Sequence, residues 1–318
     1  MDYPRSYAHG VMFHHFYGHT HVKGQGAISQ DEFDRILNFV GVGRILSPKA
    51  WLEKLAQDRL KNDDVCLTFD DSLRCQFDLA LPVLETYNIK AFWFVSSSVF
   101  EGHLGKTEIY RTFRSKYFND VEDFYDLFFK KISDFDSPLR MQDVLDESEI
   151  EKFRASFPFY SINDIKFRLV RDRYLGKEHY EAVMDKMLRE RVITHEDLAK
   201  DLWMTGDQLK YLCRTGHEIG LHSYSHPTTL CELPYAEQLQ EYHKNYAHLS
   251  AVCQRSPLSM AHPCDSYNTD TIGILRSLGI RCGFRSNMFP KEKGGRVNPS
   301  EFEIARQDHA NIMKMVEQ

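Results

Sequence analysis

The sequence lacks several features that would assign it to a broad class. No uncharged apolar run reaches the roughly 18 residues that a membrane-spanning helix needs. The net charge of −6 provides no excess of positive charge for binding nucleic acid or an anionic membrane surface. Neither an internal repeat nor a low-complexity segment is present. We therefore expect no nucleic-acid partner, no membrane span and no repeat architecture.

Cysteine is sparse, and its spacing indicates no disulfide framework. The chain has seven cysteines, none of them in a Cys-x-x-Cys motif, and an odd number cannot pair fully within one chain. The start of the sequence, from Met1 to Arg5, contains no apolar core of a secretory signal peptide. Reduced thiols in a cytoplasmic protein are the simplest interpretation of both observations. We therefore expect a cytoplasmic location.

The sequence does contain an alternation of short apolar runs and helical patterns. With 318 residues, the chain is long enough for one large α/β domain with an insertion. The runs predicted as strands are 11–13, 65–69, 91–95, 218–221, 258–260 and 280–284. Helical patterns lie between several of them, such as the one that a capping box opens at Ser29 and Glu32. This alternation predicts a parallel sheet that is closed or nearly closed.

Two chemical motifs directly follow predicted strands. Asp70 and Asp71 follow one strand, and His222 and His226 follow another. Two histidines and one aspartate can hold a divalent metal with positions open for water and substrate. The other aspartate is then free to act as a base on that water, since adjacent side chains of an extended chain point opposite ways. Barrel active sites lie at the carboxyl ends of strands, so placement and chemistry agree.

Each motif also has a less specific interpretation. Paired aspartates after a strand are common in solvated turns, and a single His-x-x-x-His pattern is a weak signal. Pro227 disfavours a helix that continues through the histidines, which leaves a loop after a strand. The presence of both motifs in one chain favours a metal-dependent hydrolase over two unrelated turns.

The motifs resemble the signatures of the polysaccharide deacetylase family, also called the NodB-homology or carbohydrate esterase family 4 group. Residues 68–71 match the signature Thr-Phe-Asp-Asp-Gly, with Ser72 at the position of glycine. Residues 222–226 match His-Ser/Thr-x-x-His fully. The third signature, Arg-x-Pro-Tyr, corresponds to residues 261–264, where Pro263 fits but arginine and tyrosine are absent.

The resemblance implies an α/β fold, the irregular (β/α)7 barrel of the NodB type. It covers residues 11–99 and 204–308, and the segment between them carries no family signature but is rich in charged and aromatic residues. We expect that segment to be a mostly helical insertion, and it is either a packing appendage or oligomer surface, or a lid over the substrate. The predicted organisation is a first barrel part at 1–100, the insertion at 101–203 and a second barrel part at 204–318.

The family pattern assigns roles to the matched residues. It implies that Asp71, His222 and His226 are the metal ligands and that Asp70 is the catalytic base. The backbone N–H of Cys264, at the position of the family's tyrosine, is expected to stabilise the oxyanion, because a backbone donor needs no particular side chain.

Further residues are candidates for catalytic or substrate-binding roles, and alternatives to these roles stay open. Arg306 is a candidate for the guanidinium missing from the third signature, against the alternative of a surface ion pair. His309 is a candidate general acid that protonates the leaving amine, and His262 competes for this role or for substrate binding. His14 and His15, after the first predicted strand, are expected to line the substrate pocket.

The expected function is the metal-dependent hydrolysis of an N-acetyl or similar small acyl group on a sugar. Zinc fits the ligand types best, although iron, cobalt and nickel also accept two histidines and one aspartate. A cytoplasmic location would make an intracellular glycan or glycoconjugate precursor the substrate. Two alternatives stay open: a catalytically degenerate deacetylase fold that binds carbohydrate, and a deacylase of a non-sugar amide. The oligomeric state is not predictable from the sequence.

Overall fold

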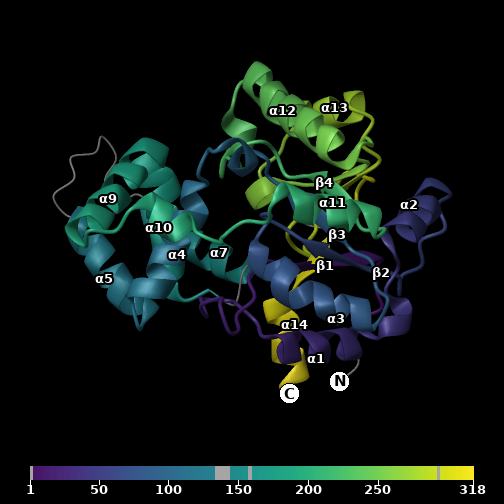
Figure 1. Cartoon of the computed structure of the whole chain (residues 1–318), viewed down its shortest axis with the longest axis horizontal. Helices are drawn as coiled ribbons and strands as arrows, with labels where there is room; N and C mark the ends of the chain where they lie inside the picture. The colour runs from purple at the N-terminus through teal and green to yellow at the C-terminus, as the bar shows by residue number, and fades with distance from the viewer. Residues whose placement is uncertain (1–2, 133–143, 157–159, 292–293) are drawn as a thin grey trace. The chain divides into compact units, whose positions relative to one another are not determined.

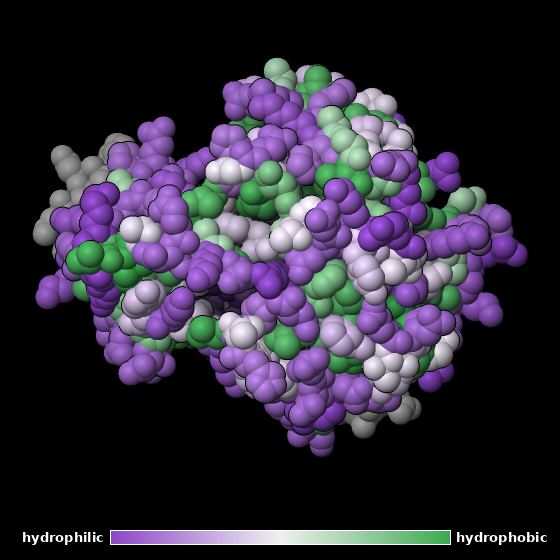
Figure 2. Space-filling view, viewed as in Figure 1, coloured by the Kyte–Doolittle hydropathy of each residue, from purple (hydrophilic) through white to green (hydrophobic). Residues whose placement is uncertain are grey.

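The computed structural model describes residues 3–132, 144–156, 160–291 and 294–318 (Figure 1). These residues fall into two compact units. The barrel unit consists of Met1–His21, Gly26–His103 and Asp201–Gln318. The helical unit consists of Val22–Gln25 and Leu104–Lys200. Hydrophilic side chains cover most of the face of each unit that Figure 2 shows.

A parallel sheet of seven strands forms the centre of the barrel unit. Its order is β6-β5-β4-β3-β2-β1-β7. An isolated parallel bridge between Phe284 and Ile304 links the two ends of this order and nearly closes the barrel. The predicted α/β barrel is therefore confirmed. The strands are β1 (His9–Phe13), β2 (Val65–Phe69), β3 (Phe92–Val95), β4 (Glu218–Leu221), β5 (Ser259–Ala261), β6 (Cys282–Phe284) and β7 (Arg306–Asp308).

Helices surround the strands of the barrel unit (Figure 1). The predicted capping box at Ser29 and Glu32 is present and opens the first of them, and a second capping box joins Thr205 to Gln208. The helices are α1 (Gln30–Val40), α2 (Pro48–Ala56), α3 (Leu81–Thr86), α11 (Gly206–Arg214), α12 (Tyr235–Cys253), α13 (Thr269–Ser277) and α14 (His309–Val316). Short helical turns lie at Val42–Arg44, Gln76–Ala80, Ser98–Glu101, Leu230–Glu232 and Pro263–Asp265.

The strands separate two apolar layers, because successive side chains point to opposite faces. One layer fills the barrel interior and includes Cys66, Phe92, Phe94, Ala261, Cys282 and Phe284, with Trp51 of α2 packed against Phe284. The other layer, which includes Leu67, Phe69, Trp93, Val95 and Met260, packs against the surrounding helices. Every second side chain of a strand points into the barrel, and this alternation also determines which side chains point inward at the carboxyl ends of the strands.

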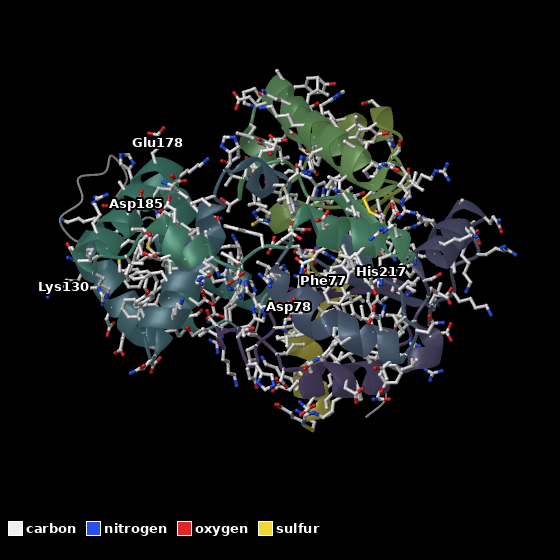
Figure 3. The ribbon with its side chains drawn as sticks, viewed as in Figure 1. Phe77, Asp78, Lys130, Glu178, Asp185 and His217 are labelled. Carbon is white, nitrogen blue, oxygen red and sulfur yellow. A yellow bond between two sulfur atoms is a disulfide. The ribbon has the colours of Figure 1, made fainter. Side chains whose placement is uncertain are left out.

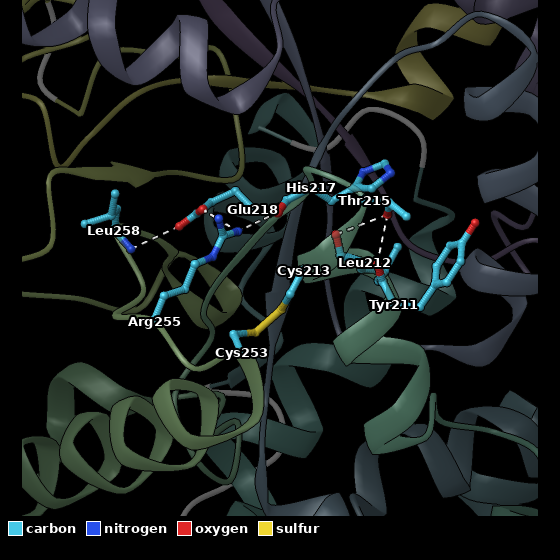
Figure 4. The surroundings of a disulfide bond; sticks show 9 residues. All are labelled: Tyr211, Leu212, Cys213, Thr215, His217, Glu218, Cys253, Arg255 and Leu258. Carbon is cyan, nitrogen blue, oxygen red and sulfur yellow. Dashed lines mark hydrogen bonds and ion pairs between the residues drawn. A yellow bond between two sulfur atoms is a disulfide. The ribbon is translucent and has the colours of Figure 1, made fainter.

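A disulfide joins Cys213 of α11 to Cys253 of α12 (Figure 4). The prediction that all thiols are reduced is therefore wrong. The two cysteines are 40 residues apart in the sequence and meet because α11 and α12 pack against each other around the barrel. Structural disulfides are typical of proteins that fold in oxidising compartments, so this bond weakens the basis for a cytoplasmic location.

The described part of the helical unit contains helices and no strand. Its helices are α4 (Lys106–Tyr117), α5 (Val121–Ile132), α7 (Glu147–Ser156), α8 (Ile162–Leu169), a π-helical turn (Val170–Leu175), α9 (Gly176–Glu190) and α10 (His195–Ala199). Asp185 of α9, which is labelled in Figure 3, joins three of them, because its carboxylate accepts hydrogen bonds from Tyr110 of α4 and His195 of α10. No helix among the described residues of either unit is long and apolar enough to span a membrane.

Aromatic side chains of the insertion form the core of the helical unit itself. Phe124 and Phe128 lie on one face of α5, and both contact the ring of Phe167. Phe113, Phe124, Tyr125 and Phe128 are fully buried, so they cannot stack on a sugar. Phe157 and Phe159 lie outside the described residues. A lid over the substrate stays a prediction, and it would depend on other side chains of this unit.

Candidate active site

The two aspartates stand at the carboxyl end of β2, where the chain turns sharply. Asp70 continues the inward alternation of the strand and is only 2% exposed. The backbone then adopts left-handed conformations, with φ of 75° at Asp71 and 61° at Ser72. Glycine adopts such backbone without steric cost, which explains the glycine that the family signature has at the position of Ser72. Here Ser72 is buried, and its hydroxyl donates to the carbonyl of Ser96 at 3.4 Å.

The two histidines converge on Asp71 from the loop after β4, residues 222–226, which we call the histidine loop. His222 Nε2 and His226 Nε2 lie 3.4 Å and 3.3 Å from the same oxygen, Asp71 Oδ1. His222 Nδ1 donates to the carbonyl oxygen of Ala261 at 2.8 Å, which turns the other ring nitrogen, Nε2, toward Asp71.

These three residues fit a divalent metal. One ligand atom from each lies within 4.8 Å of the others. Ligands at about 2.0–2.1 Å from a tetrahedral zinc are roughly 3.3–3.4 Å apart, which agrees with the contacts that His222 and His226 make to Asp71. Three protein ligands leave a fourth position for water or substrate, as in catalytic rather than structural zinc sites. The structure therefore contains a possible metal site at the predicted residues.

Arg306 of β7 pairs with Asp70 inside the barrel. Its Nη1 and Nη2 donate to the two carboxylate oxygens at 2.7 Å and 2.8 Å, and both side chains are almost fully buried. Arg306 Nε donates to the carbonyl of Arg285 at 2.6 Å, which fixes the plane of the guanidinium. Gly10 of β1 leaves room for this side chain, because a Cβ at that position would lie 3.0 Å from Arg306 Cγ. The last strand thus brings to Asp70 the guanidinium that the third signature lacks.

The surrounding charges keep both aspartates ionised. Burial raises the pKa of Asp70, but the Arg306 guanidinium and then the imidazoles of His222 and His14 more than offset this, so its pKa lies below the ordinary value. Burial also raises the pKa of Asp71, whereas its hydrogen bond to His222 and the neighbouring imidazole charges hold it well below the ordinary value. A carboxylate that is ionised at neutral pH is the form that a metal ligand or a general base requires.

His14 reaches the aspartates from the end of β1. Its Nε2 lies 3.7 Å from Asp70 Oδ2 and 3.9 Å from Asp71 Oδ2, and its side chain is 26% exposed. The ring of His15 lies parallel to that of His14 with the centroids 6.4 Å apart. Of the two histidines predicted to line the pocket, His14 therefore contacts the acidic pair.

The positions of His262 and His309 argue against their predicted roles. The His262 ring is buried, contacts the carbonyl of Phe302 through Nε2 at 2.8 Å, and has a pKa that burial lowers to about 3. Such an imidazole is uncharged at neutral pH, its Nε2–H is donated to the Phe302 carbonyl, and it offers no exposed edge to a substrate. His309 is also buried, and its two nitrogens face the carbonyl oxygens of Met12 and Gly26. The sequence could not show which way the two rings point.

Cys264 lies in the turn after β5, and its side chain is exposed. Its backbone has φ of 51°, a left-handed conformation that turns the chain directly after the strand. The same strand ends at Ala261, whose carbonyl accepts the hydrogen bond from His222, so the turn follows the strand that orients a metal-ligand candidate. The role of the Cys264 N–H as an oxyanion donor stays a prediction.

Two buried amides that hold the site, Gln76 and Asn245, belong to no motif in the sequence. Gln76 donates to the carbonyls of Asp70 and His14 at 2.6 Å and 2.8 Å, which fixes the ends of β2 and β1 together. Asn245 of α12 accepts a hydrogen bond from the N–H of His222 at 3.1 Å. Polar residues inside helical segments with apolar neighbours at helical spacing are the signal that could have found them.

Comparisons with known proteins agree with the motifs and the fold. The family model described as "Polysaccharide deacetylase" matches residues 182–283, a range that includes the histidine loop and the degraded third signature. No curated protein matches the chain in a sequence search. The resemblance to this family, predicted from the two motifs, is confirmed.

Solved deacetylase structures share the fold over nearly the whole chain. The Streptococcus pyogenes deacetylase PplD in complex with acetate is 15% identical, with a TM-score of 0.55 and 98% of each chain covered. IcaB from Ammonifex degensii is 13% identical, with a TM-score of 0.56 and 98% of each chain covered. A de-N-acetylase from Aggregatibacter actinomycetemcomitans is 11% identical, with a TM-score of 0.55, and 97% of this chain and 99% of that chain are covered. At these identities the likeness establishes the NodB-type (β/α)7 barrel and not a shared substrate.

Replacement of Arg306 by glutamine should strongly destabilise the protein at neutral pH. It leaves the Asp70 carboxylate buried without its counter-charge, and the loss of one partner of a buried pair costs about 3–5 kcal/mol. In the native protein the pKa of Asp70 is lowered, so the stability that this group contributes is present above about pH 4 and is lost as the pH falls through its folded-state pKa. In the variant, burial without the guanidinium should raise that pKa, so the deficit should shrink on acidification.

Urea denaturation of both proteins between neutral and acidic pH measures this difference. As a control, Asp70→Asn combined with Arg306→Gln should be more stable than Arg306→Gln alone, because no buried charge is left unpaired. Equal free energies of unfolding for Arg306→Gln and the native protein at pH 7 would contradict the buried pair.

Proposed function

We propose that the protein is a metal-dependent deacetylase that hydrolyses the N-acetyl, or a similar small acyl, group of an amino sugar in a glycan. The observation that carries this proposal is the convergence at one rim of the barrel of an open metal site and a second carboxylate. That carboxylate, Asp70, is held by Arg306 and is not needed as a ligand. The family match and the deacetylase fold support the same reaction.

The residues at the rim divide the chemistry among them. Asp71, His222 and His226 would hold a divalent metal, which when bound would supply a Lewis acid to polarise the acyl oxygen and lower the pKa of water. Asp70 takes the proton of the attacking water, and its bidentate pair with Arg306 keeps the carboxylate ionised and fixed in direction. The backbone N–H of Cys264 is proposed to donate to the oxyanion. Zinc suits this ligand set best, and iron, cobalt or nickel are compatible with it.

His14 is the best candidate for the general acid. The leaving amine must gain a proton when the carbon–nitrogen bond breaks. The rings of His262 and His309 are buried against backbone carbonyls, whereas His14 is partly exposed and adjoins both aspartates. A proton donor beside Asp70 can reach the nitrogen that leaves from the same carbon that the water attacks.

The disulfide bears on where the substrate is found. The prediction of an intracellular glycan precursor rests on a cytoplasmic location, which stays a prediction. The bond between Cys213 and Cys253 favours instead a chain that folds in an oxidising compartment. A glycan polymer outside the cytoplasm is therefore a second candidate substrate for the same reaction.

The purified protein should contain close to one equivalent of divalent metal, and His222→Ala or His226→Ala should empty the site. Loss of one of three protein ligands removes a large part of the binding free energy of the metal. Elemental analysis measures the metal content. His243→Ala is a matched control, because this histidine is exposed on α12. Full occupancy in both ligand variants would exclude the site.

Asp70→Asn should keep its metal and lose most of its activity. Loss of a general base lowers kcat by about two to four orders of magnitude. Acetate release from N-acetylated oligosaccharides, measured together with metal content, separates the two effects. If the variant instead loses its metal, the roles of Asp70 and Asp71 are exchanged. If it keeps both metal and activity, Asp70 is not the base.

His14→Gln should affect amide substrates far more than activated esters. An amine must be protonated to leave, whereas an acidic phenol leaves as its anion without help. We expect kcat for an N-acetyl sugar to fall about 100-fold or more. The rate with an aryl acetate should fall much less, and the metal content should not change. Equal losses on both substrates would contradict a role for His14 as the general acid.

A further inference from the structure

The histidine loop adopts a backbone that needs support from its surroundings. Ser223 and His226 both lie in the left-handed region, with φ of 59° and 56°. Non-glycine residues rarely adopt this conformation, and it persists where neighbouring groups over-determine the path of the chain. One of these residues, His226, is itself a candidate metal ligand. The conformation of the loop, and with it the position of this candidate ligand, therefore depends on the groups that surround the loop.

One face of α12 supplies much of this support. Glu241, Asn245 and His248 are spaced four and three residues apart, so they lie in a row on one side of the helix. We call these three residues the α12 stripe. The Glu241 carboxylate accepts hydrogen bonds from both the N–H and the hydroxyl of Ser225, at 2.8 Å and 2.7 Å. The first member of the stripe thus holds the loop one residue before His226.

Asn245 holds the other end of the loop. Its Oδ1 accepts the hydrogen bond from the N–H of His222, and its Nδ2 donates to the carbonyl of Val95 and the hydroxyl of Ser97, both at 2.9 Å. The side chain is fully buried, and the contacts to the His222 N–H and the Val95 carbonyl fix which end of the amide is oxygen. This one amide therefore links α12, the chain after β3 and the first histidine.

His248 acts on the middle of the loop through a carboxylate. Its Nδ1 lies 3.2 Å from Glu101 Oε1, and Glu101 Oε2 accepts a hydrogen bond from the Tyr224 hydroxyl at 2.7 Å. Together, the three members of the stripe fix the loop at its start, middle and end. None of them faces the possible metal as one of its ligands.

We propose that the α12 stripe positions the two histidines for metal, so that a helix outside the site sets part of the metal affinity. The inference rests on the metal site of the proposed function. Without the stripe, the left-handed residues would relax toward common backbone conformations, and metal binding would have to order the loop again. A loop that is already ordered avoids this cost, which is the general basis of preorganised sites.

Metal affinity distinguishes positioning from a role in stability alone. We expect Asn245→Ala and Glu241→Ala each to weaken Zn²⁺ binding about 10- to 100-fold, the range found when groups that orient metal ligands are removed. The measurement is competition with a chromophoric chelator, at a temperature well below the Tm of every variant. Glu241 is only partly buried, so Glu241→Ala tests the proposal even if Asn245→Ala folds poorly.

The same helix offers matched controls. Gln238 is a fully buried amide that bonds to the Leu233 carbonyl and the Thr271 hydroxyl, not to the histidine loop. Glu237 is exposed one turn before Glu241. Gln238→Ala should lower the Tm and leave the Kd for Zn²⁺ within twofold, and Glu237→Ala should change neither. Native affinity in both stripe variants, or an equal loss of affinity in Gln238→Ala, would overturn the proposal.

Hydrogen exchange of the metal-free protein tests the loop directly. The amides of His222 and Ser225 should exchange faster in Asn245→Ala and Glu241→Ala, respectively, than in the native protein and the two controls. Unchanged exchange at both amides overturns the preorganised loop. A native protein that binds no Zn²⁺ overturns the metal site of the proposed function together with this inference, whereas native-like binding by the stripe variants overturns this inference alone.

Discussion

The buried pair between Arg306 and Asp70 is the interaction on which the site depends. A carboxylate that is removed from water without a counter-charge would take up a proton and could not act as a base. The planar guanidinium matches both carboxylate oxygens at once, and the Arg285 carbonyl fixes its orientation from behind. The pair also joins the last strand to the second strand across β1, where Gly10 leaves the space that it needs. The candidate base Asp70 and the link between β7 and β2 across β1 thus rely on the same contact.

Left-handed backbone is the second constraint that the site shares. Asp71 and Ser72 adopt it after β2, and Ser223 and His226 adopt it after β4. In both places the chain leaves a strand and then directs side chains back over the barrel. Left-handed residues allow the chain to turn in this way within a few residues. Hydrogen bonds to the turns offset the free-energy cost of these backbone conformations. In the first turn Ser72 donates to Ser96, and in the second the α12 stripe bonds to the histidine loop. Unusual backbone at a functional site is thereby stabilised from outside that site.

The two units differ in how they use their aromatic residues. The barrel interior is filled by an apolar cluster that includes Trp51 of α2 and Phe284, and the polar groups of the site lie at the carboxyl ends of the strands. In the helical unit, the rings of α4, α5 and α8 pack against one another. Its aromatic richness is therefore explained by the need of a small helical unit to bury enough apolar surface. Any contact of this unit with a substrate would involve its polar or partly exposed side chains.

The sequence by itself determined most of the local elements and the residues of the possible metal site. Short apolar runs predicted six of the seven strands, β1 to β6, a capping box predicted the start of α1, and the two motifs identified Asp70, Asp71, His222 and His226. These features are readable because they depend on neighbours within a few residues. Only the tertiary structure decided that Arg306 reaches Asp70, that His14 adjoins the acidic pair, and that His262 and His309 face backbone carbonyls. It also brought Cys213 to Cys253. Each of these contacts joins residues from separate strands or helices. The contacts depend on the order of the strands and on the direction of side chains across the barrel, and neither produces a periodic pattern in the sequence.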